Sequence, residues 1–219
     1  MRVAVFCGSK TGDSPLFMEA ATAFGRALAT HGHDLVYGGA AHGLMGAVAG
    51  AVLEGGRHVI GVVPRGWSTQ ERSRSSGTLD QPGSERSGEL AKAERPETQE
   101  FAHPELSEHV LVDDLYQRKA MMAQKADAFV ALPGGFGTLD ELFDMLTAAQ
   151  VGLHAKPIGL LDVDGYYAPL LGWITQALQR GFIPSGLKEL LLVRSNPDDL
   201  VRALLTHQPP PSTVRWIRD

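Results

Sequence analysis

The 219-residue chain lacks a second cysteine, an excess of basic charge and a long apolar run. With Cys7 as its single cysteine it can form no intrachain disulfide, which favours a reducing, cytoplasmic location. A formal net charge of −5 offers no broad basic surface, so we expect no nucleic-acid partner. The longest apolar stretches, such as 47–53, fall far short of the roughly 20 residues that a membrane-spanning helix needs, so we expect no membrane partner.

The first residues also lack the charged and apolar regions of a secretory signal, because residues 2–6 already have the pattern of a strand. Hydrophobic residues make up 43% of the chain and charged residues 21%, which are ordinary values for a soluble globular protein. At this length we expect one domain over residues 1–208 and a C-terminal tail over 209–219.

Short runs rich in valine, isoleucine and leucine alternate with longer stretches of helical periodicity. This alternation is typical of a mostly parallel sheet with helices on both faces, so we predict a doubly wound, Rossmann-like α/β fold of about seven strands. The predicted strands span 2–8, 34–38, 58–63, 110–113, 128–132, 157–162 and 190–193. The predicted helices span 15–31, 44–54, 114–125, 138–151, 166–180 and 197–206.

Residues 68–98 break this alternation, because they are mostly small, charged or proline, with Leu79 and Leu90 as the large apolar residues. Such a segment buries too little surface to offset its ordering entropy. We interpret it as a surface insertion that is flexible or weakly helical near 89–95. A tolerated loop extension and a lid or partner-contact role are both open.

A glycine-rich turn follows the buried strand predicted at 128–132, and we call residues 133–138 the phosphate turn. Glycines let the backbone approach a ligand closely, and the N–H groups that start the next helix can hold an anion. Ligands of open parallel sheets bind beyond the carboxyl ends of the strands, where this turn lies. A plain strand-to-helix turn is the other reading, with Thr138 capping a helix whose first turn contains Asp140 and Glu141.

Two further strand ends carry little side-chain bulk, at residues 7–10 and 38–46. Three such ends favour a crevice that a flat or charged ligand can enter. The turn after the first strand lacks the dinucleotide fingerprint, and none of the three ends in Gly-Lys-Ser/Thr, which disfavours NAD and a nucleoside triphosphate loop.

The helix predicted at 114–125 places Arg118 and Met122 four residues apart on one face, which is therefore not a purely solvent-exposed face. Taken alone, Arg118 and Lys119 also suit a solvated basic pair. Glu141 alone suits a residue that stabilises the dipole of its helix.

Together these motifs resemble the paired signatures of the Lonely Guy family, the cytokinin riboside 5′-monophosphate phosphoribohydrolases often mislabelled lysine decarboxylases. The resemblance rests on Arg118-Lys119 and on residues 133–141, and it covers nearly everything outside the insertion. It extends over residues 38–39, 43–46, 147–150, 156–167 and 181–183.

Members of this family cleave the N-glycosidic bond of a purine nucleoside 5′-monophosphate, AMP or an N6-substituted relative, to free base and ribose 5-phosphate. The resemblance implies at least a homodimer, and it assigns catalysis to Arg118 and Glu141. Glu100 and His103 resemble the family's Glu-x-x-His element. The predicted substrate contacts are Ser9, Gly39, Met45, Glu100, His103, Lys119, Pro133, Gly134, Gly135, Phe136, Gly137, Thr138 and Thr147.

The chemistry suits these residue types. Breaking a glycosidic bond builds oxocarbenium character on the sugar, which the carboxylate of Glu141 can stabilise while it orients a water. Because arginine stays protonated in proteins, Arg118 is a poor proton donor and instead suits a fixed cation that polarises the substrate.

The sequence departs from the family at Tyr116, where histidine is frequent, and at Leu115, where methionine is usual. The insertion precedes Glu100 and enters the expected base-side wall, which puts the base preference in doubt.

Two other functions compete with this interpretation. A non-catalytic nucleotide-binding or carrier protein would keep the phosphate turn without needing Glu141. A pyridoxal-dependent decarboxylase would need a Schiff-base lysine, but Lys119 and Lys125 have the neighbours of a solvated helix. The histidines, His31 and His33 included, lack metal-ligand spacing, so we expect no metal and no cofactor, and we expect Cys7 to be a core residue.

Overall fold

The protein is described by a computed structural model that covers residues 1–65, 103, 105–208 and 210. Seven parallel strands form one sheet, which confirms the predicted doubly wound α/β class. The strands are β1 (Arg2–Phe6), β2 (Asp34–Tyr37), β3 (Val59–Pro64), β4 (Glu108–Val112), β5 (Ala128–Ala131), β6 (Ile158–Leu161) and β7 (Leu191–Arg194). The helices are α1 (Pro15–Thr30), α2 (Gly43–Glu54), α4 (Leu115–Lys125), α5 (Phe136–Gln150), α6 (Ala168–Gln179), η1 (Ser185–Leu190) and α7 (Pro197–Thr206).

The strand order, β4-β3-β2-β1-β5-β6-β7, reverses direction between β1 and β5. The chain runs outward from β1 to β4 and then returns to the other side of β1. In such a sheet the connections after the two central strands leave in opposite directions, which opens a crevice beyond their carboxyl ends. The turns after β1 and β5 contain Gly8 and the phosphate turn, so the fold brings these two predicted turns together.

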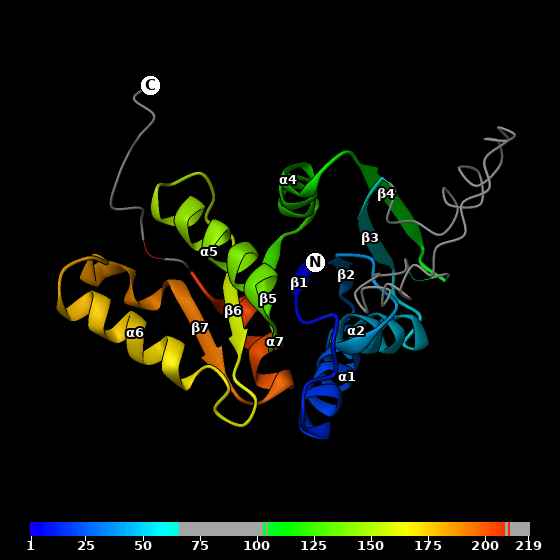
Figure 1. Cartoon of the computed structure of the whole chain (residues 1–219), viewed down its shortest axis with the longest axis horizontal. Coiled ribbons are helices and arrows are strands. Elements are labelled where there is room, and N and C mark those ends of the chain that lie inside the picture. Colours follow the sequence, from blue (N-terminus) through cyan, green and yellow to red (C-terminus); the bar gives the residue numbers. More distant parts are fainter. Residues whose placement is uncertain (66–102, 104, 209, 211–219) are drawn as a thin grey trace, which may run out of the picture.

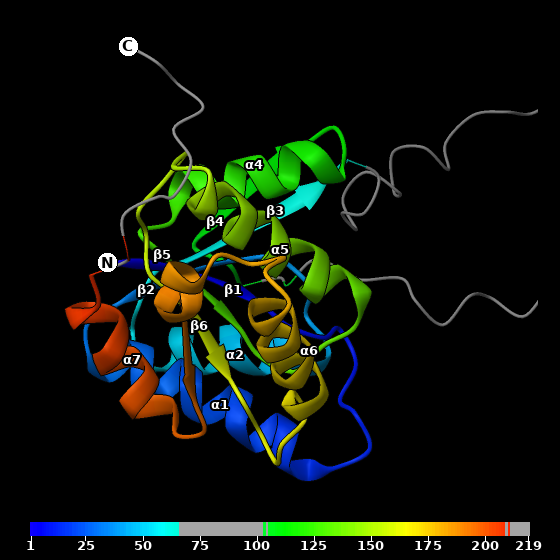
Figure 2. The same cartoon turned by 90° about the vertical axis from the view of Figure 1, so that its left-hand side faces the viewer.

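Helices cover both faces of the sheet, with α4, α5 and α6 on one side and α1, α2 and α7 on the other (Figures 1 and 2). Alternate residues of the central strands therefore belong to different cores: Val3 and Val5 to one, Ala4 and Phe6 to the other. Both β1 and β5 are buried, as the apolar run at 128–132 predicted for a central strand.

Several element boundaries differ from the sequence-based prediction by one or two residues, and two of these differences have a clear physical reason. Strand β4 starts two residues early, because this edge strand alternates polar and apolar residues and its polar start gives no apolar signal. Helix α6 begins at Ala168 rather than residue 166, because Asp164 and Gly165 have positive φ angles and turn the chain first. The short helix η1 was not predicted.

Among the helices of the described ranges, none is both long and apolar enough to cross a membrane. The predicted insertion at 68–98 lies outside the described residues, as does the tail from 211 onward.

Candidate active site

Arg118 is a buried cation near the carboxyl ends of β2 and β3. Helix α4 begins after Asp114, whose side chain accepts a hydrogen bond from the amide of Gln117. One turn on, Arg118 is only 7% exposed, so the solvated-pair reading is wrong for this residue. Its Nε donates to the Val62 carbonyl at 3.1 Å and its Nη2 to the Gly38 carbonyl at 3.0 Å. Two backbone carbonyls thus fix the guanidinium.

A glycine is needed at position 38 for this arrangement. A Cβ there would overlap the guanidinium of Arg118. The glycine-rich turn after β2 therefore makes room for a buried cation of the protein itself.

Glu141 lies on α5 and faces Arg118. Its Oε1 is 4.0 Å from Arg118 Nη1, and the residue is 6% exposed. Burial weakens solvent screening, so the two groups interact more strongly than an exposed pair at this distance would. The structure thus brings the two predicted catalytic side chains together from helices that are separated by β5.

Helix α5 starts two residues earlier than the sequence predicted. Gly135 is its N-cap and Phe136 its first residue, so Asp140 and Glu141 follow the first turn rather than belonging to it. The prediction that they lie in the first turn is therefore wrong, and so is the reading of Thr138 as N-cap. Since dipole effects fade within one turn, stabilising the helix start is a weak explanation for a buried Glu141.

The phosphate turn is held in place by two consecutive tyrosines that the sequence analysis did not single out for a role. The Tyr167 hydroxyl donates to the Leu132 carbonyl at 2.7 Å, and the Tyr166 hydroxyl donates to the Gly134 carbonyl at 2.7 Å. Gly8 N–H adds a bond to the Pro133 carbonyl at 3.0 Å. Burial raises the pKa of Tyr167, which keeps its hydroxyl protonated and able to donate. These bonds fix the turn at the start of α5, where a helix has amides without intrahelical partners.

Removing the Tyr167 hydroxyl is expected to destabilise the fold. In Tyr167→Phe the buried carbonyl of Leu132 loses its donor, which costs about 1–3 kcal/mol. Urea unfolding should show this loss, whereas Tyr166→Phe should cost less because Tyr166 is 44% exposed and Tyr167 only 2%. Equal stability of the Tyr167→Phe variant and the wild type would contradict the tether.

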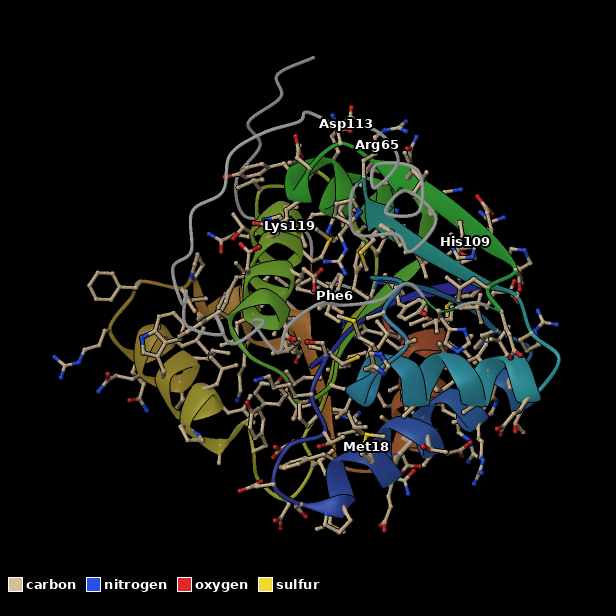
Figure 3. All side chains as sticks on the ribbon, turned by 45° about the vertical axis from the view of Figure 1, so that its right-hand side comes forward. Phe6, Met18, Arg65, His109, Asp113 and Lys119 are labelled. Atoms are coloured by element: carbon tan, nitrogen blue, oxygen red, sulfur yellow. The ribbon has the colours of Figure 1, made fainter. Side chains whose placement is uncertain are left out.

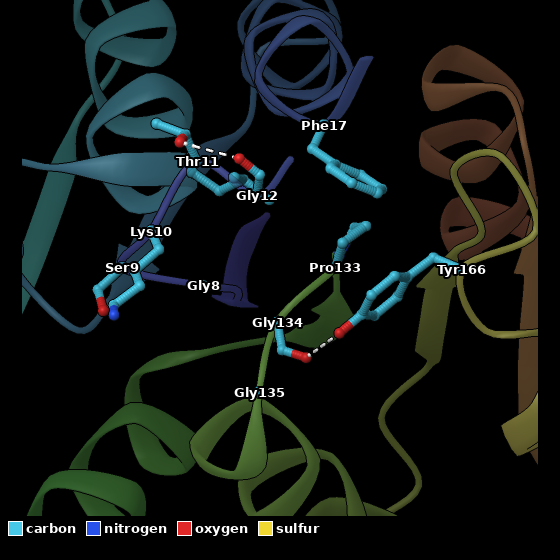
Figure 4. Close-up of a pocket in the computed structure, with 11 residues that line it drawn as sticks. Gly8, Ser9, Lys10, Thr11, Gly12, Phe17, Pro133, Gly134, Gly135 and Tyr166 are labelled. Atoms are coloured by element: carbon cyan, nitrogen blue, oxygen red, sulfur yellow. Dashed lines mark hydrogen bonds between the residues drawn. The ribbon is translucent and has the colours of Figure 1, made fainter. Parts of the chain in front are cut away.

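A cavity of about 310 Å³ opens beside the phosphate turn (Figure 4). Phe17 and Tyr166 form an aromatic wall, edge to face, with ring centroids 5.6 Å apart. Four predicted substrate contacts line it: Ser9, Pro133, Gly134 and Gly135. Arg118 and Glu141 do not line it, because the cavity lies toward α1 and α2 while the pair lies beneath α4 and α5. The phosphate turn thus borders the cavity and leads directly into the helix that carries Glu141.

Three other predicted substrate contacts, His103, Gly39 and Met45, form backbone hydrogen bonds near this edge of the sheet. The amide of His103 donates to the Gly39 carbonyl at 2.8 Å, which joins two predicted residues at the end of β2. Gly39 has a φ of +87°, a conformation that favours glycine. Burial lowers the pKa of His103. Met45 is a core residue whose amide donates to Gly8.

The remaining predicted residues lie in different surroundings. Phe136 is 95% exposed, whereas Thr138 is buried against the turn. Thr147 lines a separate apolar cavity of about 220 Å³ between α5, α6 and η1, so the single chain does not place it at the Arg118–Glu141 pair. Lys119 is ion-paired to α5. Glu100 lies outside the described residues.

Within residues 1–65, 103, 105–208 and 210, no three histidine, cysteine, aspartate or glutamate side chains gather as metal ligands would. His31 instead bonds Asp198, with Nε2 2.7 Å from Oδ1. Cys7 is buried in the core.

Comparison with known proteins gives two kinds of likeness. The chain is 43% identical over 208 residues, 95% of its length, to the Arabidopsis thaliana cytokinin riboside 5′-monophosphate phosphoribohydrolase LOG7, covering 82% of that protein. It is 42% identical over 95% of its length to the probable cytokinin riboside 5′-monophosphate phosphoribohydrolase LOGL2 of Oryza sativa subsp. japonica, covering 73% of it. Among solved structures, the molybdenum cofactor carrier protein of Chlamydomonas reinhardtii matches 94% of this chain and 98% of its own at 20% identity and a TM-score of 0.59.

At 20% identity this likeness shows a shared fold alone. Residues 45–204 also match the protein family described as possible lysine decarboxylase. With this match and more than 40% identity to these relatives over nearly its whole length, the chain belongs to the Lonely Guy family.

Proposed function

We propose that this protein hydrolyses the N-glycosidic bond of a purine nucleoside 5′-monophosphate, adenine or cytokinin-type, to free base and ribose 5-phosphate. The observation that carries the proposal is the buried pair of Arg118 and Glu141, 4.0 Å apart, on α4 before the phosphate turn and on α5 after it. The names of the plant relatives, phosphoribohydrolases at about 40% identity, support the same reaction.

The proposed division of labour follows from the geometry. The amides that begin α5 hold the phosphate monoester, because a helix start offers unpaired donors and a positive dipole end. The carboxylate of Glu141 stabilises the positive charge that builds on the sugar and orients the attacking water. Arg118 is fixed by two carbonyls and serves as an immobile cation that positions Glu141 and polarises the substrate.

The experiment is a product assay across nucleoside 5′-monophosphates, with AMP and an N6-substituted AMP as first substrates. Free base and ribose 5-phosphate should appear in equal amounts, and the corresponding nucleosides without phosphate should react poorly. The absence of free base from every monophosphate would overturn the proposal.

Two glycines of the phosphate turn provide a sharper prediction. A Cβ at Gly137 meets open space, whereas a Cβ at Gly134 would overlap Thr138. The free energy of unfolding of Gly137→Ala should therefore equal that of the wild type or exceed it by up to about 1 kcal/mol, because alanine favours helix over glycine. It should nevertheless raise KM for AMP, since the open space is where the phosphate is proposed to sit. Gly134→Ala should lose stability and activity together, and an unchanged KM in Gly137→Ala would contradict this placement.

A non-catalytic carrier is the competing function, and the fold likeness to the molybdenum cofactor carrier protein of Chlamydomonas reinhardtii is its only support. A carrier would have no use for a buried carboxylate beside a fixed guanidinium. The decarboxylase reading is weaker still, because Lys119 is bound to two aspartates and Lys125 to Glu108 at 2.8 Å.

We also propose that the protein is a cytoplasmic homodimer. Helix α6 has Ala177 as its buried residue, while Trp173 is 52% exposed and packs edge to face on Phe143 of α5. Apolar side chains of this size favour an interface over a solvent-exposed surface. Thr147 lies on this same face, so a substrate contact there is compatible with a pocket that a second subunit completes.

Trp173→Arg should therefore convert the dimer to a monomer in size-exclusion chromatography with light scattering. Glu54→Arg, an exposed change on α2, is the matched control and should leave the mass unchanged. A wild type that elutes as a monomer would contradict the proposed assembly.

A further inference from the structure

Lys119 connects the two helices that carry Arg118 and Glu141. Lys119, which is labelled in Figure 3, lies on α4. Its ammonium is 2.8 Å from Asp140 Oδ2 and 2.6 Å from Asp144 Oδ2. Lys119 follows Arg118 on α4, and Asp140 precedes Glu141 on α5. This ion-paired cluster, which we call the Lys119 clasp, is therefore one residue away from both members of the buried pair.

Neighbouring residues on each helix point to different partners. On α5, Asp140 and Asp144 are four apart and share a face that is about half exposed, whereas Glu141 is turned inward. On α4, Arg118 is turned toward the sheet, while Lys119 reaches α5 with its side chain 15% exposed. Both the Lys119 clasp and the Arg118–Glu141 pair therefore join α4 to α5, the clasp on the outer side and the pair on the side that faces the sheet.

Helices α4 and α5 both pack mainly on the sheet and share an apolar core that includes Met122 and Leu142. Helix α4 packs chiefly against β1, β2, β3 and β4, and α5 packs chiefly against β5, β1 and η1. The buried residues of α4 are Arg118 and Met122. Because the two helices have few direct backbone contacts, the ion pairs from Lys119 contribute to fixing how α4 lies relative to α5.

The positive charge of Lys119 is paired with the carboxylates of Asp140 and Asp144. Burial acts to lower its pKa, but the hydrogen bonds to Asp140 and Asp144 outweigh burial and raise the pKa of Lys119 to about 12. The ammonium thus stays protonated across the working range of most enzymes. Two carboxylates already neutralise it, which makes it a poor partner for a substrate phosphate.

We propose that Lys119 is a positioning residue: by holding Asp140 and Asp144 it sets the spacing of α4 and α5, and with it the distance from Arg118 to Glu141. The catalytic consequence rests on the proposed hydrolase function, whereas the clasp itself does not. This role replaces the direct substrate contact that the family resemblance implied for Lys119.

The kinetic test compares both ends of the clasp. Lys119→Met and the double variant Asp140→Asn/Asp144→Asn should each lower kcat for AMP by about 10- to 100-fold, since small misplacements of catalytic groups cost this much. KM should change far less. The combined triple variant should be no slower than either, because all three changes break one unit. Lys119→Arg, which can still bridge two carboxylates, should restore most of kcat.

A matched control lies on the same helix. Lys125 pairs with Glu108 at 2.8 Å but is remote from Arg118 in sequence, two turns further along α4. Lys125→Met should therefore leave kcat unchanged. If Lys119→Met raises KM at constant kcat while the aspartate variants keep or lower KM, Lys119 binds the phosphate and the proposal is overturned.

A measurement of stability tests the Lys119 clasp independently of the proposed hydrolase activity. A double-mutant cycle on urea unfolding, with Lys119→Met and the aspartate pair, should show coupling whether or not the protein cleaves nucleotides. Additive stabilities would overturn the clasp. If the wild type cleaves no nucleotide but the cycle shows coupling, the hydrolase function fails and the clasp stands as a structural link.

Discussion

Replacing Glu141 by glutamine is expected to lower kcat for AMP hydrolysis by about 10²- to 10³-fold, the usual cost of removing one group that stabilises transition-state charge. Glutamine keeps the size of the side chain and can hydrogen-bond a water, but it carries no charge to stabilise an oxocarbenium-like sugar. The substitution also leaves the buried guanidinium of Arg118 without its carboxylate, so it should lower the free energy of unfolding. The loss should be smaller than in Arg118→Met, because Arg118 keeps its hydrogen bonds to the carbonyls of Val62 and Gly38. KM should stay close to the wild-type value, since the phosphate is proposed to bind the amides of α5.

The measurement is release of free adenine under saturating AMP, with urea unfolding of the same preparations to exclude misfolding. Glu19→Gln, an exposed change on α1, is the control and should keep full activity. Near-normal cleavage by Glu141→Gln would show that the carboxylate does not act at the sugar.

The alternation of apolar and amphipathic segments was enough to predict the fold class, because each strand and helix carries its own local signal. The strand order was out of reach, since the placement of β5 beside β1 depends on contacts between residues more than 120 positions apart, such as Val3 and Ala128. Helix starts at glycine were also hard to place. Gly135 caps α5 without a polar side chain, so the sequence placed the start at Thr138, where a hydroxyl resembles a cap.

In the candidate site, too, the sequence identified residues, whereas the contacts between them depend on tertiary packing. The family resemblance picked out Arg118 and Glu141, but their proximity follows from helix packing and not from any local pattern. The tethers from Tyr166 and Tyr167 to the phosphate turn join residues 32 and 35 positions apart. Their signal was the tyrosine pair itself, in a segment noted only for its family likeness. Thr147 stays a prediction: it lies nine residues along α5 from Thr138, roughly 13 Å at 1.5 Å per residue, and lines a separate cavity of the single chain.

Arg118→Met is expected to have the second large effect, on stability as well as on rate. The variant leaves the carbonyls of Val62 and Gly38 without their donors, and it leaves Glu141 buried without its cation. Removing one partner of a buried ion pair costs about 3–5 kcal/mol. The free energy of unfolding from urea titration should fall by an amount near the lower end of this range, because the pair is 4.0 Å apart. Adenine release, assayed well below the melting temperature, should fall by at least about 10²-fold.

A change at Gly38 separates the position of the guanidinium from its charge. In Gly38→Ala the new Cβ overlaps the Arg118 guanidinium and must displace it, although the charge of the protein is unaltered. If Arg118 acts by holding a fixed cation beside Glu141, Gly38→Ala should lose kcat nearly as Arg118→Met does. The kcat of Arg118→Lys should lie between the kcat values of these two variants and that of the wild type. A lysine keeps the charge, but it lacks the planar guanidinium that donates to both carbonyls. Full activity in Gly38→Ala, with the side chain displaced in its structure, would mean that the charge alone matters and the geometry of the pair does not.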